Sequence, residues 1–241
     1  AIHAGHNYNQ ELLPYLEIPE LGRLFEEDVA TDRFAESIPN SVIGLDSRAE
    51  YDLNRPAEMA VPLTPEHFWG VRVFKEVPPE EQIKKSLEKY HAFHRFLKTV
   101  VVFLVDRFGG CVVHDIHSYN RSRQIEKGFD SPPLFNLGTM NLDRARWGKY
   151  IEDWLDELST ISITNLETTV AENLVFPGNG IIQRSMKDIE SKVLVLATEV
   201  AKSYMNEHTG ELHEEIVNSI SNGMREAIMK HSEIFQKQFQ N

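Results

Sequence analysis

The residues best suited to chemistry lie near the middle of the chain, in a seven-residue stretch that reads DIHSYNR at positions 115–121. This stretch follows the apolar run CVV at 111–113, with His114 between the two. The pattern predicts that His117 lies just beyond the carboxyl end of a buried strand, where ligands bind in open α/β sheets. A neutral imidazole in that position is a candidate metal ligand.

Three further polar clusters fall at or beside predicted strands. They are His3 with His6, the segment 46–55 with Arg48, Asn54 and Arg55, and Glu199. Taken singly, each has an ordinary structural explanation, such as a surface histidine or an ion pair. Together with His117 they contain what zinc catalysis needs: imidazoles and a carboxylate to hold the metal, and a second carboxylate as general base.

Helical and strand patterns alternate along the chain, with no internal repeat and no long linker. We expect strands at 42–46, 111–116 and 193–199, and helices at 80–107, 145–158 and 211–236. This order predicts one α/β domain over residues 1–241, a three-layer sandwich whose mixed, mostly parallel sheet has helices on both faces. The segments 122–143 and 168–185 read as loops that could supply pocket walls.

Charge and composition exclude several classes of partner. The 241 residues include 37 acidic and 25 basic side chains, so the net charge of −12 disfavours nucleic acid and anionic membranes. No run of residues is apolar enough for a membrane helix. One cysteine, Cys111, cannot form an internal disulfide, which fits a cytoplasmic protein. The chain opens abruptly on AIHAGH, as if earlier residues of a strand had been trimmed.

An ordered set of short motifs resembles the N-formylglutamate amidohydrolase family. The motifs are IHAGH at 2–6, EED at 26–28 with TD at 31–32, SRAEYDLNRP at 47–56, DIHSYN at 115–120, NLGT at 136–139, and EVAK at 199–202 with MNEHTG at 205–210. The resemblance covers nearly the whole chain. The motif around His117 also resembles the zinc carboxypeptidases, which implies a zinc-exopeptidase-like (phosphorylase/hydrolase-like) fold.

The resemblance implies one zinc ion held by His3, His117 and an acidic residue. Glu27 and Asp28 are the adjacent candidates for the acidic ligand, and we prefer Glu27. Adjacent helical residues point about 100° apart, so one of the two should face the metal. The alternative is a three-histidine site, in which His6 coordinates instead.

The resemblance also assigns the remaining roles. Glu199 would be the general base that takes a proton from water and passes it to the leaving amine, and Asp115 could orient an imidazole as its hydrogen-bond partner. The implied substrate-binding residues are Arg48, Asn54, Arg55, Ser118, Tyr119, Arg121 and Arg123. Arginine suits this task because its planar fork binds carboxylates bidentately. Relatives tend to read SYNHRR where this chain reads SYNRSR at 118–123, which changes the register of its arginines.

The implied reaction is the hydrolysis of an acidic N-acyl amino acid, with N-formyl-L-glutamate giving formate and glutamate at the end of histidine degradation. Two alternatives remain. A zinc exopeptidase that removes a C-terminal residue would use the same metal, base and arginines. A catalytically silent protein that binds an acidic metabolite would keep the pocket without a metal.

Overall fold

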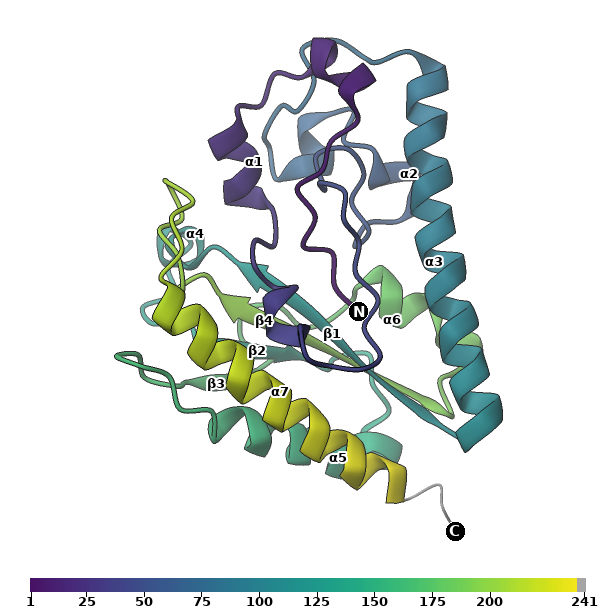
Figure 1. Ribbon diagram of the computed structural model, residues 1–241, viewed down its shortest axis with the longest axis vertical. Helices are drawn as coiled ribbons and strands as arrows, with labels where there is room; N and C mark the ends of the chain where they lie inside the picture. The colour runs from purple at the N-terminus through teal and green to yellow at the C-terminus, as the bar shows by residue number, and fades with distance from the viewer. Residues whose placement is uncertain (238–241) are drawn as a thin grey trace.

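The computed structural model describes residues 1–237, and its centre is a four-stranded sheet in the order β1-β4-β2-β3 (Figure 1). The strands are β1 (Cys111–Tyr119), β2 (Phe135–Gly138), β3 (Val170–Glu172) and β4 (Val193–Ala201). β1 pairs with β4 and β2 with β3 in parallel, whereas β4 and β2 are antiparallel. The prediction of a mixed, mostly parallel sheet is confirmed.

Seven α-helices accompany the sheet within the described residues. They are α1 (Glu20–Glu26), α2 (Ala57–Ala60), α3 (Glu80–Phe108), α4 (Arg121–Glu126), α5 (Arg144–Ser159), α6 (Ile181–Ser185) and α7 (Glu214–Lys237). The helices expected at 80–107, 145–158 and 211–236 are α3, α5 and α7, with bounds shifted by three residues at most. None of the seven is both long enough and apolar enough to cross a lipid bilayer.

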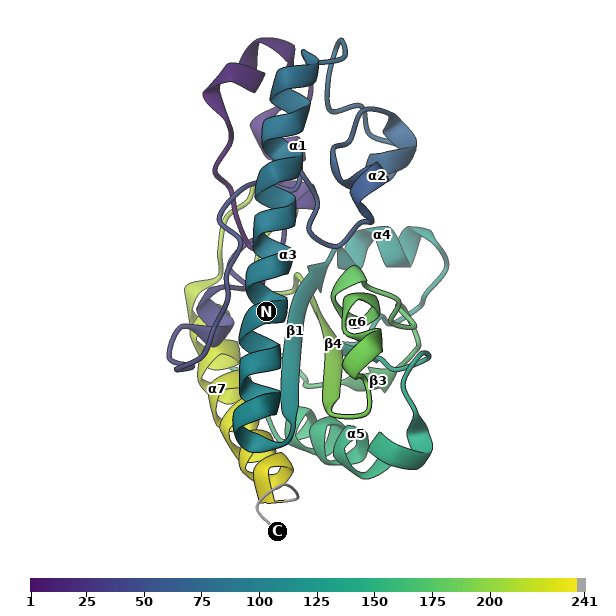
Figure 2. The same ribbon diagram turned by 90° about the vertical axis from the view of Figure 1, so that its right-hand side faces the viewer.

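The helices form layers on both faces of the sheet (Figures 1 and 2). On one face, Leu194 and Leu196 of β4 belong to the same apolar cluster as the inward side chains of α5 and α7. On the other, Val193 and Val195 pack with α3 and α6. Alternate residues of a strand point to opposite faces, so β4 must be apolar on both, and its sequence VLVLA is.

The two longest strands of the sheet, β1 and β4, are longer than their apolar patterns predict. β1 continues to Tyr119 rather than ending at residue 116, and β4 continues to Ala201 rather than ending at 199. The two strands pair residue by residue from Cys111 with Val193 to Tyr119 with Ala201. The backbone ladder therefore extends into the polar motif, and His117 lies within β1 rather than beyond it.

The expected strand at 42–46 forms only isolated bridges. Ile2 lies between this segment and β1, donating its N–H to the Val42 carbonyl at 3.0 Å, while the Ile116 N–H bonds the Ala1 carbonyl at 3.0 Å. The first residues of the chain are thus tied to the edge of the sheet at β1. This pairing brings His3 beside the strand that carries His117.

A long excursion between the first residues and α3 forms the upper part of the molecule, purple to blue in Figure 1. Its apolar side chains, including Leu53 and Phe68, pack with Tyr90 of α3 in a second cluster. The Tyr90 hydroxyl donates to the Arg55 carbonyl at 2.8 Å. Packing against α3 therefore holds the segment 46–55 of the excursion above the carboxyl ends of β1 and β4.

Candidate metal centre and active-site pocket

The sheet brings His117 and Glu199 to neighbouring positions on one face. These two residues are directly paired in the register of β1 with β4, and Asp115 lies two residues before His117. Side chains two apart on a strand point the same way, so Asp115 and His117 share a face. The predicted convergence of a histidine in the central motif with Glu199 follows from this register.

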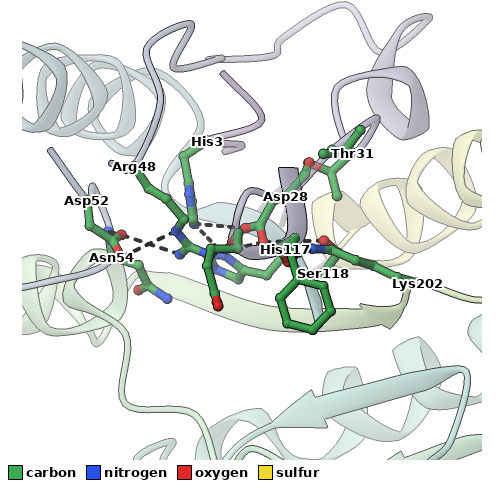
Figure 3. Close-up of polar contacts among 12 residues, drawn as sticks. His3, Asp28, Thr31, Arg48, Asp52, Asn54, His117, Ser118 and Lys202 are labelled. Atoms are coloured by element: carbon green, nitrogen blue, oxygen red, sulfur yellow. Dashed lines mark hydrogen bonds and ion pairs between the residues drawn. The ribbon is translucent and has the colours of Figure 1, made fainter. Parts of the chain in front are cut away.

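His3, Asp28 and His117 form a compact, buried group of side chains (Figure 3). His3 Nε2 lies 2.7 Å from His117 Nδ1 and 3.2 Å from Asp28 Oδ2, and His117 Nδ1 lies 3.5 Å from the same oxygen. A tetrahedral zinc ion with bonds of about 2.0–2.2 Å separates its ligand atoms by about 3.3 Å. The two distances to Asp28 Oδ2 are close to this value, and the 2.7 Å between the imidazole nitrogens is shorter, so the three atoms face one small space that an ion could share.

The surroundings of Asp28 fit a metal ligand as well as its position does. Oδ1 accepts hydrogen bonds from Arg48 Nη1 at 3.2 Å and Ser118 Oγ at 3.3 Å. Oδ2, which faces the two imidazoles, is buried and has no hydrogen-bond partner within residues 1–237. A buried carboxylate oxygen without a partner is costly, and a cation between Asp28, His3 and His117 would supply one.

Asp115 fixes the orientation of His117 from behind. One of its carboxylate oxygens lies 3.0 Å from His117 Nε2, and both side chains are buried. Burial would lower the pKa of His117, but the Asp115 carboxylate, together with Asp28 and Glu199, raises that pKa well above its ordinary value. The contact directs Nδ1 of His117 towards His3 and Asp28, as outer carboxylates do for metal-binding histidines.

The preference for Glu27 as the acidic ligand was wrong, because Asp28 is the residue that lies with His3 and His117. α1 ends at Glu26, and Glu27 is extended, with φ −72° and ψ 154°, so the side chains of Glu27 and Asp28 point in different directions. Glu27 contacts His6 Nδ1 at 2.5 Å and accepts a hydrogen bond from Ser47. This second cluster also removes His6 from the metal group, so the three-histidine alternative has no geometric support among the described residues.

Glu199 faces the same pocket as His117 and Asp28. Burial raises the pKa of Glu199 to about 7, against the opposing effect of the neighbouring His117. A carboxylate whose pKa lies near neutrality can both accept and return a proton at physiological pH. Position and pKa therefore suit the general base that the sequence predicted.

The pocket has a volume of about 320 Å³ and is lined by residues from several parts of the chain, including the segments 26–28 and 48–55 of the excursion. Besides the sheet residues, it is bounded by Trp69, by residues 123, 124 and 127 of α4 and the turn after it, and by the loop 176–180. The last two fall within the segments 122–143 and 168–185, which confirms that these supply pocket walls. The same segments also contain β2, β3, α4 and α6, which their sequences did not predict.

The predicted substrate-binding arginines differ in whether they already contact acidic side chains of the protein. Arg48 is 7% exposed and contacts Asp28 and Asp52, and Arg123 contacts both carboxylate oxygens of Glu26, so both guanidinium groups already have acidic partners. Arg55 is more open, lying over the Trp69 ring and 3.9 Å from Asp52.

The remaining predicted binding residues differ in whether they line the pocket and in whether their polar atoms already have partners. Asn54 lines the pocket, and its buried Oδ1 has no hydrogen-bond partner in the described part of the chain. Ser118 and Tyr119 line it too, but their hydroxyls donate to Asp28 and to the Pro133 carbonyl. Arg121 does not line the pocket, although Arg123 and Gln124 of the same helix do; its backbone N–H donates to Glu207. For Arg121 the predicted role has no geometric support.

Trp69 and Lys202 are among the pocket residues that sequence reasoning missed. Trp69 lies beneath both Arg48 and Arg55, with the ring centroid 4.6 Å and 5.0 Å from the guanidinium carbons. Lys202 is 2% exposed at the end of β4. The position of Lys202 three residues after Glu199 was visible in the sequence, but a lysine after a strand ordinarily reaches solvent.

Comparisons with known proteins identify the family and the fold. The model of the N-formylglutamate amidohydrolase family matches residues 1–205. A crystal structure of an N-formylglutamate amidohydrolase from Ralstonia eutropha JMP134 superposes with a TM-score of 0.75 at 17% identity, covering 99% of this chain and 91% of that one. The gene product Atu2144 from Agrobacterium tumefaciens superposes with a TM-score of 0.61 at 17% identity, covering 95% and 89%. Curated protein sequences gave no significant match. With more than half of its length matched by the family model, the chain belongs to the N-formylglutamate amidohydrolase family.

Proposed function

We propose that this protein is a zinc-dependent amidohydrolase that releases formate from N-formyl-L-glutamate. The observation that carries the proposal is the group formed by His3, Asp28 and His117, whose ligand atoms lie together beside the pocket that Glu199 faces. Membership of the family supports the hydrolase class and the substrate. The two imidazoles and one carboxylate are the ligand types of a catalytic zinc site with an open position.

A zinc ion bound by these residues would supply Lewis-acid chemistry, polarising the formyl carbonyl and acidifying water. Glu199 takes the proton from the attacking water while the water oxygen forms a bond to the formyl carbon. Glu199 then returns the proton to the substrate nitrogen as the C–N bond breaks, giving formate and the amine of glutamate. Asp115 and Arg48 hold His117 and Asp28 in place throughout.

The test is a formate-release assay on protein stripped of metal and reloaded with zinc. We expect activity with zinc, loss of activity with a chelator, and a fall in kcat of roughly 100-fold or more in Glu199→Gln, the range typical of a lost general base. The variant should keep its zinc, because Glu199 is not among the three grouped ligands. Glu152→Gln, an exposed change of the same kind on α5, is the matched control.

Two results would contradict the proposal. Activity that survives complete chelation would exclude the metal, and a zinc-loaded protein that releases no formate would exclude the reaction. A dipeptide with C-terminal glutamate, assayed alongside, separates the exopeptidase: cleavage of the dipeptide in place of N-formylglutamate would establish that alternative.

A further inference from the structure

Lys202 is a buried cation that forms no ion pair within the described residues 1–237. Its side chain lines the pocket but is only 2% exposed, and Nζ donates a hydrogen bond to the Phe25 carbonyl at 2.6 Å. Among residues 1–237, no carboxylate oxygen lies within 4.0 Å of Nζ. A buried ammonium group is costly unless an anion pairs with it, and an ammonium has three donors, of which one is used here.

The other cations of the pocket are differently placed. Arg48 and Arg123 already have acidic partners, as described above, and Lys127 is exposed. Arg55, the more open arginine, belongs to the segment with Asn54. Figure 3 shows Asn54 and Lys202 on opposite sides of His117. The pocket therefore offers Lys202 on one side of His117 and, in the segment of Asn54, Arg55, whose Nε lies 3.9 Å from Asp52 Oδ2.

We propose that Lys202 binds the side-chain carboxylate of the substrate and thereby selects an acidic N-formyl amino acid over its neutral amide. The inference rests on the proposed function, since it concerns the same pocket. N-formylglutamate carries two carboxylates, one on its α-carbon and one at the end of its side chain, and the pocket offers one cationic side chain for each. The α-carboxylate is then left to Arg55 and Asn54, and the side-chain carboxylate completes the hydrogen bonding of Nζ.

The electrostatics of the site agree with this assignment. Burial lowers the pKa of Lys202 to about 8, although the neighbouring Asp28 and Glu26 act in the opposite direction. The amine is therefore mainly charged at neutral pH, as binding a carboxylate requires. Charge-assisted hydrogen bonds in a buried site are among the strongest that a protein makes, so losing this one should be measurable.

The experiment compares kcat/KM for N-formyl-L-glutamate and N-formyl-L-glutamine, which differ only in the charge and hydrogen bonding of the side-chain terminus. We expect wild-type protein to prefer the glutamate compound by roughly 10- to 100-fold, the value of one charge-assisted hydrogen bond. Lys202→Met should abolish the preference, mainly through KM. Lys202→Gln, which keeps a donor for the Phe25 carbonyl, serves if the Met variant does not fold. Lys84→Met, an exposed lysine on α3, controls for net charge.

Each outcome decides the matter. A wild-type protein that hydrolyses both compounds equally well overturns this inference alone, whatever the variants do. So does a folded Lys202 variant that retains the preference, or that loses activity equally on both compounds. If zinc-loaded wild type hydrolyses neither compound, the proposed function fails, and this inference fails with it.

Discussion

At the scale of single residues, the site depends on which atom each side chain presents. Asp28 presents one oxygen to Arg48 and Ser118 and the other to the two imidazoles. Glu27, its neighbour, is just as buried but contacts His6 and Ser47. Burial and charge alone do not distinguish the two residues, so a direct comparison of them tests the ligand assignment.

We therefore predict opposite results for two matched substitutions. Asp28→Asn should weaken zinc binding by roughly 100-fold or more, because even outer partners of a metal site contribute about 10- to 100-fold. Glu27→Gln should change zinc affinity by less than about 3-fold, because its contacts lie outside that group. Calorimetric zinc titration of the metal-free proteins measures both, and thermal melting checks that each variant is folded. The reverse order of effects would make Glu27 the ligand.

At the scale of elements, the pocket wall depends on a close approach between two backbones. A Cβ placed on Gly178 would lie 2.5 Å from the carbonyl carbon of Gly138 at the end of β2, and Gly178 has φ +79°. Only glycine meets both conditions without strain. This contact holds the loop 176–180 against the sheet, where it lines the pocket.

Gly178→Ala should therefore lower the free energy of unfolding by roughly 1–3 kcal/mol, combining positive-φ strain with steric overlap. It should also raise KM, because the displaced loop lines the pocket. Gly128→Ala is the matched control: Gly128 has φ +96° but nothing within 4 Å of its added Cβ, so it reports the φ strain alone. Urea unfolding measures both. Equal destabilisation by the two substitutions would show that the close approach contributes nothing.

The sequence predicted an element well where its apolar spacing and the residues that end it indicate the same bounds. α3 shows this, because its apolar residues recur at helical spacing and Gly109 ends it in the left-handed conformation. The strand ends were missed because polar side chains follow the apolar runs of β1 and β4 while the ladder continues beneath them. Pairing with a partner strand, which is invisible in one sequence, decides where such strands stop.

The candidate site was predictable in part for a similar reason. His3, His117 and Glu199 stand in recognisable motifs, and the fold brings them together as expected. The choice between Glu27 and Asp28 depended on α1 ending at Glu26, which neither glycine nor proline marks. The burial of Lys202 depends on the excursion that covers it, through the Phe25 carbonyl, and no local pattern indicates that contact.

At the scale of the whole molecule, the proposed metal group joins three separate parts of the chain. His3 comes from the first residues, Asp28 from the turn after α1 in the excursion, and His117 from the central sheet. An ion held by all three would link the excursion to the sheet, so metal binding would add directly to the stability of their arrangement. All three side chains must therefore bind the same single ion.

That place can be located directly by anomalous X-ray diffraction at the zinc absorption edge, using crystals of zinc-loaded protein. We expect a single dominant peak within about 2.0–2.2 Å of His3 Nε2, His117 Nδ1 and Asp28 Oδ2. A peak between His6 and Glu27 instead, or no ordered zinc near His3 and His117, would contradict this expectation.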